Sequence, residues 1–209
     1  MSLLRGYKPA EQGFGQGYTD HLTRRTKIGE WFLLHKIIPN TLSKLRGKVV
    51  DFGCGVGEIL RRCPPGSIGF ELNPTSVAHC RRLGLDVRAY DPAADGYALA
   101  GIEPGVYGTF LMSHVLEHIP DTARVLRTIL ASCHRLGFAR VVIKVPGAFM
   151  YKKDATHVTF VDRAWLRAHD LARAEGFAVD EISYYPLNAE WIGRFSIVHE
   201  TIVVYDRVG

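Results

Sequence analysis

The 209-residue chain is long enough for one domain with a sizeable core, and its 47% hydrophobic and 22% charged residues are ordinary for a globular protein. The formal net charge is +5, but the basic residues occur mostly as scattered pairs, so we expect no nucleic-acid partner, while an anionic substrate stays compatible with this charge. No apolar run approaches the ~18 residues of a membrane span. The N-terminus lacks the apolar stretch of a signal peptide, and the four cysteines form no C-x-x-C pair. Both features favour a cytoplasmic protein with reduced thiols.

The first 45 residues predict a loose arm followed by a helix. Glycines are frequent over residues 1–19. From Asp20, a candidate N-cap, apolar residues recur at helical spacing to about Leu45, and Pro39 interrupts them. The simplest interpretation is a helix packed beside a sheet.

A strand, a glycine-rich loop and a helix are predicted in that order over residues 48–62. Two β-branched residues precede Asp51, as in a buried parallel strand. Glycines then occupy alternate positions, namely Gly53, Gly55 and Gly57. Because glycine has no Cβ, a ligand can lie against the main chain there, and a helix start offers free backbone N–H groups.

The spacing of these glycines separates several classes of ligand-binding loop. The dinucleotide motif G-x-G-x-x-G would need its third glycine at Glu58, and the G-K-[ST] of a phosphate loop is absent. The pattern [DE]-x-G-x-G-x-G resembles the first motif of class I S-adenosylmethionine-dependent methyltransferases. The resemblance implies S-adenosyl-L-methionine as cofactor and S-adenosyl-L-homocysteine as product. The loop residues it assigns to cofactor binding are Asp51, Gly53, Cys54, Gly55 and Gly57.

A second strand is predicted over residues 67–71, followed by a helix that Asn73 and Pro74 begin. Glu71 ends the strand, twenty residues beyond Asp51. A carboxylate there can accept two hydrogen bonds from a ribose diol, each contributing about 1.5–3 kcal/mol. Dinucleotide binders share this feature, and the alternative is a solvated carboxylate. We assign Glu71 and the adjacent Leu72 to the cofactor site.

A third strand is predicted over residues 85–90, with Asp91 directly after it. The methyltransferase resemblance places the polar residue at this point against the adenine amino group. Asp91 followed by Pro92 is equally a common way to open a turn, which is the alternative.

The fourth predicted strand, residues 107–112, leads into the run SHVLEHIPD. This run resembles a hallmark of one large branch of these methyltransferases, the branch with the VLEH motif. Thr109 departs from the family, which usually has an aspartate at that position. Ser113 is assigned to the cofactor site, and His114 is a candidate for cofactor contact or general base. Glu117 and His118 are interpreted mainly as capping or pairing with neighbours.

The rest of the chain continues to alternate helices and strands. A helix is predicted from Asp121 to Gly137, and a fifth strand over 139–145. A further helix is predicted from Asp162 to Glu175. Late strands are predicted near 178–185 and 196–205. This order predicts an α/β, doubly wound, mostly parallel sheet with helices on both faces.

The resemblance adds a seven-stranded sheet with an antiparallel last strand and an N-terminal helical cap. We expect residues 1–209 to form a single domain, with 1–45 as arm and cap and 46–209 as the Rossmann-like core. The cap would act as a lid over the cofactor cleft. The residues with which it would touch the ligand are Tyr7, Tyr18 or Arg24.

The loop after the fifth strand carries the second candidate catalytic cluster. Residues 154–158 resemble a D-x-T-H-V run found in a subset of bacterial methyltransferases, several of them associated with surface-polysaccharide or lipid-linked sugar synthesis. His157 is the first candidate for general base, because an unperturbed imidazole titrates near working pH. Asp154 would orient it. The alternative is that His157 caps the helix at Asp162 or binds a backbone carbonyl.

Taken together, these patterns predict a methyltransferase that acts on a small molecule, by O-methylation of a sugar or glycolipid intermediate. The alternatives are a cofactor-binding regulatory protein without methyl transfer and an NAD-dependent oxidoreductase. We expect no metal, because the histidines and cysteines lack ligand spacing and no clustered carboxylates demand magnesium. The oligomeric state is left open.

Overall fold

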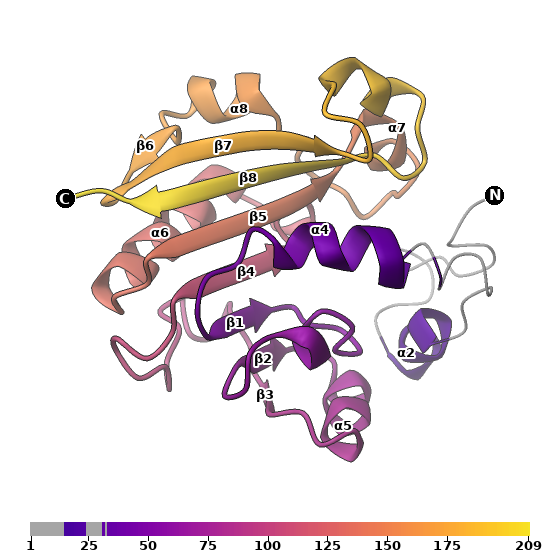
Figure 1. Ribbon diagram of the computed structural model, residues 1–209, viewed down its shortest axis with the longest axis vertical. Helices are drawn as coiled ribbons and strands as arrows, with labels where there is room; N and C mark the ends of the chain where they lie inside the picture. The colour runs from indigo at the N-terminus through magenta and orange to yellow at the C-terminus, as the bar shows by residue number, and fades with distance from the viewer. Residues whose placement is uncertain (1–14, 24–30, 32) are drawn as a thin grey trace.

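The computed structural model describes residues 15–23, 31 and 33–209, so Tyr7 and Arg24 lie outside the described residues. Within them the chain forms an eight-stranded sheet in the order β3-β2-β1-β4-β5-β8-β7-β6 (Figure 1). The first five strands run parallel. They are β1 (Val49–Phe52), β2 (Ile68–Glu71), β3 (Val87–Ala89), β4 (Thr109–Ser113) and β5 (Arg140–Pro146).

The remaining strands lie beyond β5, each antiparallel to the strand beside it. In sheet order they are β8 (Glu200–Arg207), β7 (Phe177–Tyr185) and β6 (Arg173–Ala174). The predicted mostly parallel sheet with an antiparallel last strand is confirmed. The strand beyond the seven expected is the two-residue β6, which pairs with β7. Glu175 and Gly176 form the turn between β6 and β7. Their positive φ angles, 51° and 77°, fit a tight hairpin turn.

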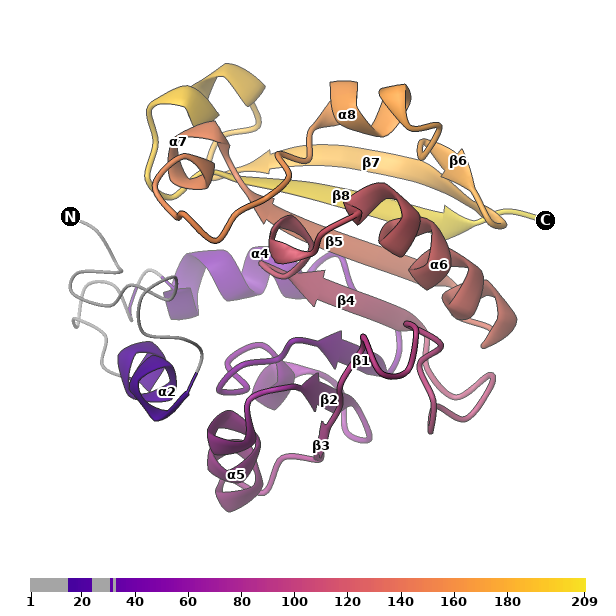
Figure 2. The same ribbon diagram turned by 180° about the vertical axis from the view of Figure 1, so that it is seen from behind.

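Helices lie on both faces of the sheet, as predicted. α4 covers one face and α6 the other (Figures 1 and 2). The α-helices are α2 (Gln16–Thr23), α4 (Ile38–Leu42), α5 (Pro74–Arg82), α6 (Thr122–Arg135), α7 (Ala148–Tyr151) and α8 (Arg163–Ala168). The π- and 3₁₀-helices are η1 (Leu33–Ile37), η2 (Leu60–Arg62), η3 (Leu116–His118) and η4 (Glu190–Arg194). Among the described residues, none of these helices combines the length and apolar character needed to cross a bilayer.

The larger core lies between the sheet and α6. One stripe of α6 faces Phe110 and its neighbours on the strands and is no more than 1% exposed. The stripe consists of Val125, Leu126, Ile129, Leu130 and Cys133. Burial of each such side chain contributes roughly 1.5–3 kcal/mol, so this stripe fixes α6 against the sheet. A smaller apolar cluster around Leu111 and Val142 occupies the opposite face.

β5 is buried along its whole length even though it contains two cations. Arg140 donates to both oxygens of Asp206 at 2.6 and 2.7 Å. Lys144 lies 3.1 Å from Glu200 Oε2 and donates to Thr41 of α4 at 2.9 Å. Ion pairing is what makes the burial of these cations tolerable. The hydrogen bond from Lys144 to Thr41 also attaches α4 to the sheet.

The described residues of the segment predicted as helical from Asp20 to about Leu45 are mostly helical, but the start of the helix differs from the prediction. Asp20 lies inside α2, where it accepts a hydrogen bond from Gln16 at 2.7 Å, and is not an N-cap. Pro39 lies in the first turn of α4, which directly follows the π-helix η1. Proline has no N–H to donate, which suits the point where the helical hydrogen-bond pattern changes.

Two further helices are shorter than predicted. The segment after Gly57 forms only the 3₁₀-helix η2, and Cys63 is already extended, as the residue before a proline tends to be. α8 is capped by Asp162 as expected, with Oδ1 accepting from Trp165 N–H at 2.7 Å. It ends at Ala168 instead of Glu175, because the following residues form β6.

Smaller differences concern single residues. Asp121 precedes α6 but its side chain makes no capping hydrogen bond, and it pairs with Arg124 instead. The last strand begins at Glu200, not near 196, after the helical turn η4. Thr109, which replaces the family's aspartate, exchanges two hydrogen bonds with the backbone of Arg46, at 2.7 and 2.8 Å.

Candidate active site

The carboxyl ends of the parallel strands meet at one edge of the sheet, which is where open α/β sheets bind ligands. The glycine loop after β1 lies there against the end of β2. Gly55 donates its N–H to Glu71 Oε2 at 2.7 Å, and Asn73 donates to Oε1 at 2.8 Å. The structure therefore brings the predicted loop and the predicted ribose carboxylate into direct contact.

The three glycines of the loop have different surroundings. All have positive φ angles, 73°, 55° and 78° in chain order. A Cβ on Gly53 would come within 2.4 Å of Val115, and one on Gly57 within 2.5 Å of Leu85. Gly57 is buried, whereas Gly53 and Gly55 are half-buried. Gly57 thus serves the packing of the protein itself, and the surface that a ligand can approach is at Gly53 and Gly55.

Glu71 keeps acceptor capacity for a ligand. Burial raises its pKa, and backbone N–H groups of Asn73, Gly55 and Leu72 counteract part of this. A carboxylate has about four acceptor positions, and two are used by the hydrogen bonds to Gly55 and Asn73. Two further hydrogen bonds, the number a ribose diol donates, can therefore be accepted. The adjacent Leu72 side chain is 62% exposed.

Asp51 and Cys54 lie beneath the loop. Asp51 is 2% exposed, and burial, together with the charge of Glu71, raises its pKa to about 7 against the opposing charge of Lys144. A hydrogen bond with Cys80 and burial raise the pKa of the Cys54 thiol. These groups support the loop from below and are largely uncharged or only partly charged near neutral pH.

Asp91 comes shortly after β3, and Ser113 is the last residue of β4. Asp91 Oδ1 accepts hydrogen bonds from Ala93 and Ala94 at 3.0 and 3.3 Å, so it opens a turn, the alternative considered for it. Its side chain is exposed at the ligand edge, with Oδ2 outside these bonds. Ser113 is half-buried beside Lys144 of β5.

His114 lies between two carboxylates. Its φ of 56° turns the ring toward β8, where Nε2 is 2.8 Å from Glu200 Oε1, and Nδ1 is 3.4 Å from Glu117 Oε1. Burial lowers the pKa of His114, but Glu117 and Glu200 outweigh it and raise the pKa to about 9. Glu200 is lowered to a pKa of about 2 because Lys144 and His114 outweigh its burial. His114 is therefore an imidazolium at neutral pH, which argues against its predicted role as general base.

His157 has the opposite arrangement. Its side chain is 8% exposed, and Nδ1 is 2.9 Å from the carbonyl oxygen of Tyr151. A carbonyl only accepts, so Nδ1 carries the proton and the neutral ring has its lone pair on Nε2. Asp154 does not orient the ring, because its Oδ2 is 4.0 Å from Nε2 while Oδ1 accepts from Thr156. The backbone carbonyl of Tyr151 performs that task.

Comparison with known proteins identifies the family. Residues 24–187 match the family model of a methyltransferase domain. The chain belongs to this methyltransferase family. It is 32% identical over 122 residues to a ubiquinone biosynthesis O-methyltransferase of Methylococcus capsulatus, which covers 52% of this chain and 49% of that protein. A protein of the same name from Ralstonia nicotianae is 29% identical over 203 residues, 82% of each chain. The chain thus spans about half the length of the first relative.

Solved structures agree on the fold. A SAM-dependent methyltransferase from Archaeoglobus fulgidus matches with a TM-score of 0.62 and 19% identity, over 91% of this chain and 99% of that one. Magnesium protoporphyrin IX methyltransferase from Synechocystis, with bound SAH, matches with a TM-score of 0.63 and 15% identity, over 95% and 98%. The predictions of a class I methyltransferase and of S-adenosylmethionine as its cofactor are confirmed. The narrower branch with the VLEH motif stays a prediction.

A buried polar cluster adjoins His157 in this methyltransferase. Glu117 is fully buried, and within the described residues neither of its carboxyl oxygens makes a well-formed hydrogen bond. Its Oε1 is 4.0 Å from His157 Nε2. Ligand atoms of Glu117, His118 and His157 all lie within 4.8 Å of one another. One carboxylate and two imidazoles can hold a divalent metal ion, and the prediction of no metal, which relied on spacing along the chain, stays a prediction.

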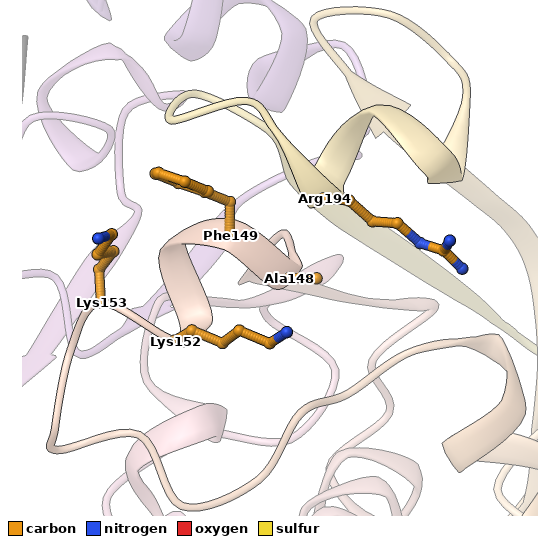
Figure 3. Close-up of a pocket in the computed structure, with 5 residues that line it drawn as sticks. All are labelled: Ala148, Phe149, Lys152, Lys153 and Arg194. Carbon is orange, nitrogen blue, oxygen red and sulfur yellow. The ribbon is translucent and has the colours of Figure 1, made fainter.

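Two adjoining hollows open beside α7, at the same edge of the sheet. The first, about 620 Å³, is lined by Ala148, Phe149, Lys152, Lys153 and Arg194 (Figure 3). The second, about 430 Å³, shares Ala148 and Arg194 and adds Trp191, Phe160 and His199 among others. Sequence patterns did not identify Trp191 or Arg194, because they come from the β7–β8 connection and carry no motif. Lys152 and Lys153 are one of the basic pairs of the sequence and begin the loop that carries the second candidate cluster, but no role was predicted for them.

Proposed function

We propose that the chain transfers the methyl group of S-adenosylmethionine to a hydroxyl oxygen of a small organic acceptor. The observation that carries this proposal is the 2.7 Å contact between the Gly55 N–H and Glu71, which joins the glycine loop to a carboxylate with spare acceptor positions. The names of the relatives, O-methyltransferases of ubiquinone biosynthesis, support oxygen as the methylated atom.

In this proposal the cofactor lies along the carboxyl edge from β1 to β4. Glu71 accepts hydrogen bonds from the ribose hydroxyls, and Asp91 faces the adenine with Oδ2. The cofactor lies against the backbone of the glycine loop, close to Ser113 at the end of β4. The complete proposed set is Asp51, Gly53, Cys54, Gly55, Gly57, Glu71, Leu72, Asp91 and Ser113.

The N-terminal segment is proposed to cap this edge within a single domain spanning the chain. Support comes from α2, whose Thr19 hydroxyl lies 2.7 Å from that of Thr75 and 2.9 Å from that of Ser76. Asn73 donates to the Gly15 carbonyl at 3.2 Å. α2 therefore docks on the start of α5, next to Glu71. The four free cysteines support the cytoplasmic location proposed with it.

Methyl transfer is an in-line displacement at a carbon that the sulfonium already activates. The protein must align the acceptor and remove its proton. We propose His157 as the base: Nε2 accepts the hydroxyl proton while Nδ1 stays hydrogen-bonded to Tyr151. The resulting imidazolium would lie 4.0 Å from Glu117 Oε1, the buried oxygen that also faces His114 Nδ1 at 3.4 Å, so the two rings share this carboxyl group.

His114 has a different proposed task. As an imidazolium between Glu117 and Glu200 it supplies a fixed positive charge at the end of β4. Such a preorganised charge favours an acceptor oxygen that becomes negative during proton loss.

The experiment is a methyl-transfer assay with S-adenosylmethionine labelled in the methyl group, against separate pools of phenols, sugars and glycolipid intermediates. We expect label in an ether-linked methyl group of one pool and conversion of cofactor to S-adenosylhomocysteine. A chain that binds both cofactor forms calorimetrically but labels no pool would be the regulatory protein of the alternative hypothesis. Binding of NAD with an affinity that at least matches that of S-adenosylmethionine would favour the oxidoreductase.

A further inference from the structure

The first hollow beside α7 is bordered by cations from two separate elements. Lys152 and Lys153 follow α7, and Arg194 ends η4, which packs against α7. Figure 3 shows Lys152 and Arg194 extending on the same side, with Ala148 near them, whereas Lys153 lies on the other side with Phe149. In the part of the chain that the structure describes, no carboxylate lines this hollow. It therefore concentrates positive charge where the fold is open to solvent.

Among residues 15–23, 31 and 33–209, no acidic side chain forms an ion pair with any of these three cations. Lys153 contacts the Phe149 ring, 5.3 Å from its centroid. Elsewhere the chain neutralises comparable cations: Lys44 is 2.6 Å from Glu181, and Arg140 is 2.6 Å from Asp206. Unpaired cations that border one hollow repel each other, and an anion placed among them removes that repulsion.

Two carboxylates, Asp162 and Glu190, line the second hollow. Asp162 caps α8 through the Trp165 N–H at 2.7 Å. Burial and the nearby Glu190 raise the pKa of Tyr184. The charge of the two hollows thus changes from cationic at Lys152 and Arg194 to mixed and aromatic at Trp191, which is 65% exposed. This gradient orients a ligand with one anionic end and one apolar body.

The hollow also adjoins the proposed base. Lys152 directly follows Tyr151, whose carbonyl holds His157 at 2.9 Å and whose ring stacks on the imidazole at a centroid distance of 5.4 Å. Its volume, about 620 Å³, is within the usual range for small-molecule sites. His157 itself does not line the hollow, and the link between them is Tyr151, the residue before Lys152.

We propose that this hollow is the subsite for an anionic group, a carboxylate or phosphate, on the methyl acceptor, with Lys152 and Arg194 as its principal cations. Arg194 offers the planar fork that pairs two oxygens at once, and Lys152 adds a point charge. Lys153 strengthens the field from beside Phe149. The inference rests on the proposed methyl transfer, because it names the acceptor of that reaction.

The test measures probe binding to the protein saturated with S-adenosylhomocysteine. The probes are 3,4-dihydroxybenzoate, its neutral methyl ester, and a catechol bearing a phosphate ester. Variants Lys152→Glu and Arg194→Glu are compared with Arg82→Glu, an equal change of charge on α5 outside the hollow. We expect one anionic probe to bind at least about tenfold more tightly than the neutral ester. Each hollow variant should remove that preference, and Arg82→Glu should keep it.

The outcomes separate the two proposals. Preference for the carboxylate or for the phosphate probe identifies the group. Equal binding of charged and neutral probes, no binding of either anion, or equal losses in Arg82→Glu would overturn the anionic subsite. The same titrations report S-adenosylhomocysteine affinity. Normal affinity with methyl transfer only to neutral acceptors would overturn the subsite alone, whereas bound probes without any transfer would overturn the enzymatic proposal alone.

Discussion

The charge on His114 makes a measurable prediction about stability. The pKa of this ring rises from 6.5 to about 9 on folding, because Glu117 and Glu200 outweigh its burial. A group whose folded pKa is raised contributes its full stability below the unfolded pKa and loses it as the pH rises through the folded pKa. We therefore expect this contribution to be complete below about pH 6.5 and to be lost by about pH 9.

The magnitude follows from the same values. A rise from 6.5 to about 9 corresponds to about 3.4 kcal/mol at 1.36 kcal/mol per pKa unit. The side chain is 42% exposed, so solvent screening reduces the contribution to roughly 1–1.5 kcal/mol. Replacement by asparagine tests it, because asparagine tolerates the positive φ of 56° and does not titrate.

The assay is urea unfolding of the unmodified chain and of His114→Asn at several pH values from 6 to 9.5. The free energy of unfolding of the unmodified chain, relative to the variant, should fall by about 1–1.5 kcal/mol across this range. Taking the difference cancels groups common to both proteins, Asp51 among them. A difference that stays constant with pH, or an NMR titration of the His114 ring near 6.5, would refute the two-carboxylate reasoning.

Four other predictions concern the glycine loop, the ribose carboxylate and the base. Gly55→Val should abolish calorimetric binding of S-adenosylhomocysteine because its φ of 55° and its place at the ligand edge exclude a branched side chain, while circular dichroism stays that of a folded protein. Gly57→Ala should instead lower the melting temperature, since the added Cβ meets Leu85 at 2.5 Å; equal stability would remove Gly57 from the packing. Glu71→Gln should weaken cofactor affinity at least about tenfold by removing a charged acceptor, and unchanged affinity would contradict the ribose assignment. His157→Gln should lower turnover without changing cofactor affinity and should abolish the dependence of turnover on a basic group; a retained pH profile would exclude it as base.

Features encoded by neighbouring residues were predictable from the sequence. The N-cap at Asp162 and the glycine loop depend on residues within a few positions, and both are present. Lengths of helices were less predictable. α8 ends at Ala168 because Ala174 pairs with Phe177 in the sheet. The helical periodicity of the sequence does not indicate this pairing. The sequence predicted that Gly55 and Glu71 belong to the same cofactor site. Their hydrogen bond was not predicted, because it depends on the position of β2 beside β1 in the sheet.

The electrostatics of the site could not be predicted in the same way. Glu200 lies on the last strand, far along the chain from His114, and only the antiparallel register of β8 against β5 places it beside that ring. Likewise Arg194 and Lys152 line the same hollow only because η4 packs on α7. The partners that set charge and protonation come from distant segments, so residue type and motif alone left His114 as a second candidate for the base beside His157.

The fold separates those two histidines by what it places at their ring nitrogens. At His114 both nitrogens face carboxylates, at 2.8 and 3.4 Å, so both carry protons and the ring cannot accept another. At His157 one nitrogen faces a backbone carbonyl that only accepts, which leaves the other with a lone pair. His157 Nε2 is therefore the nitrogen that we propose as the proton acceptor, and His114 is the group that we propose as a fixed positive charge at the same edge of the sheet.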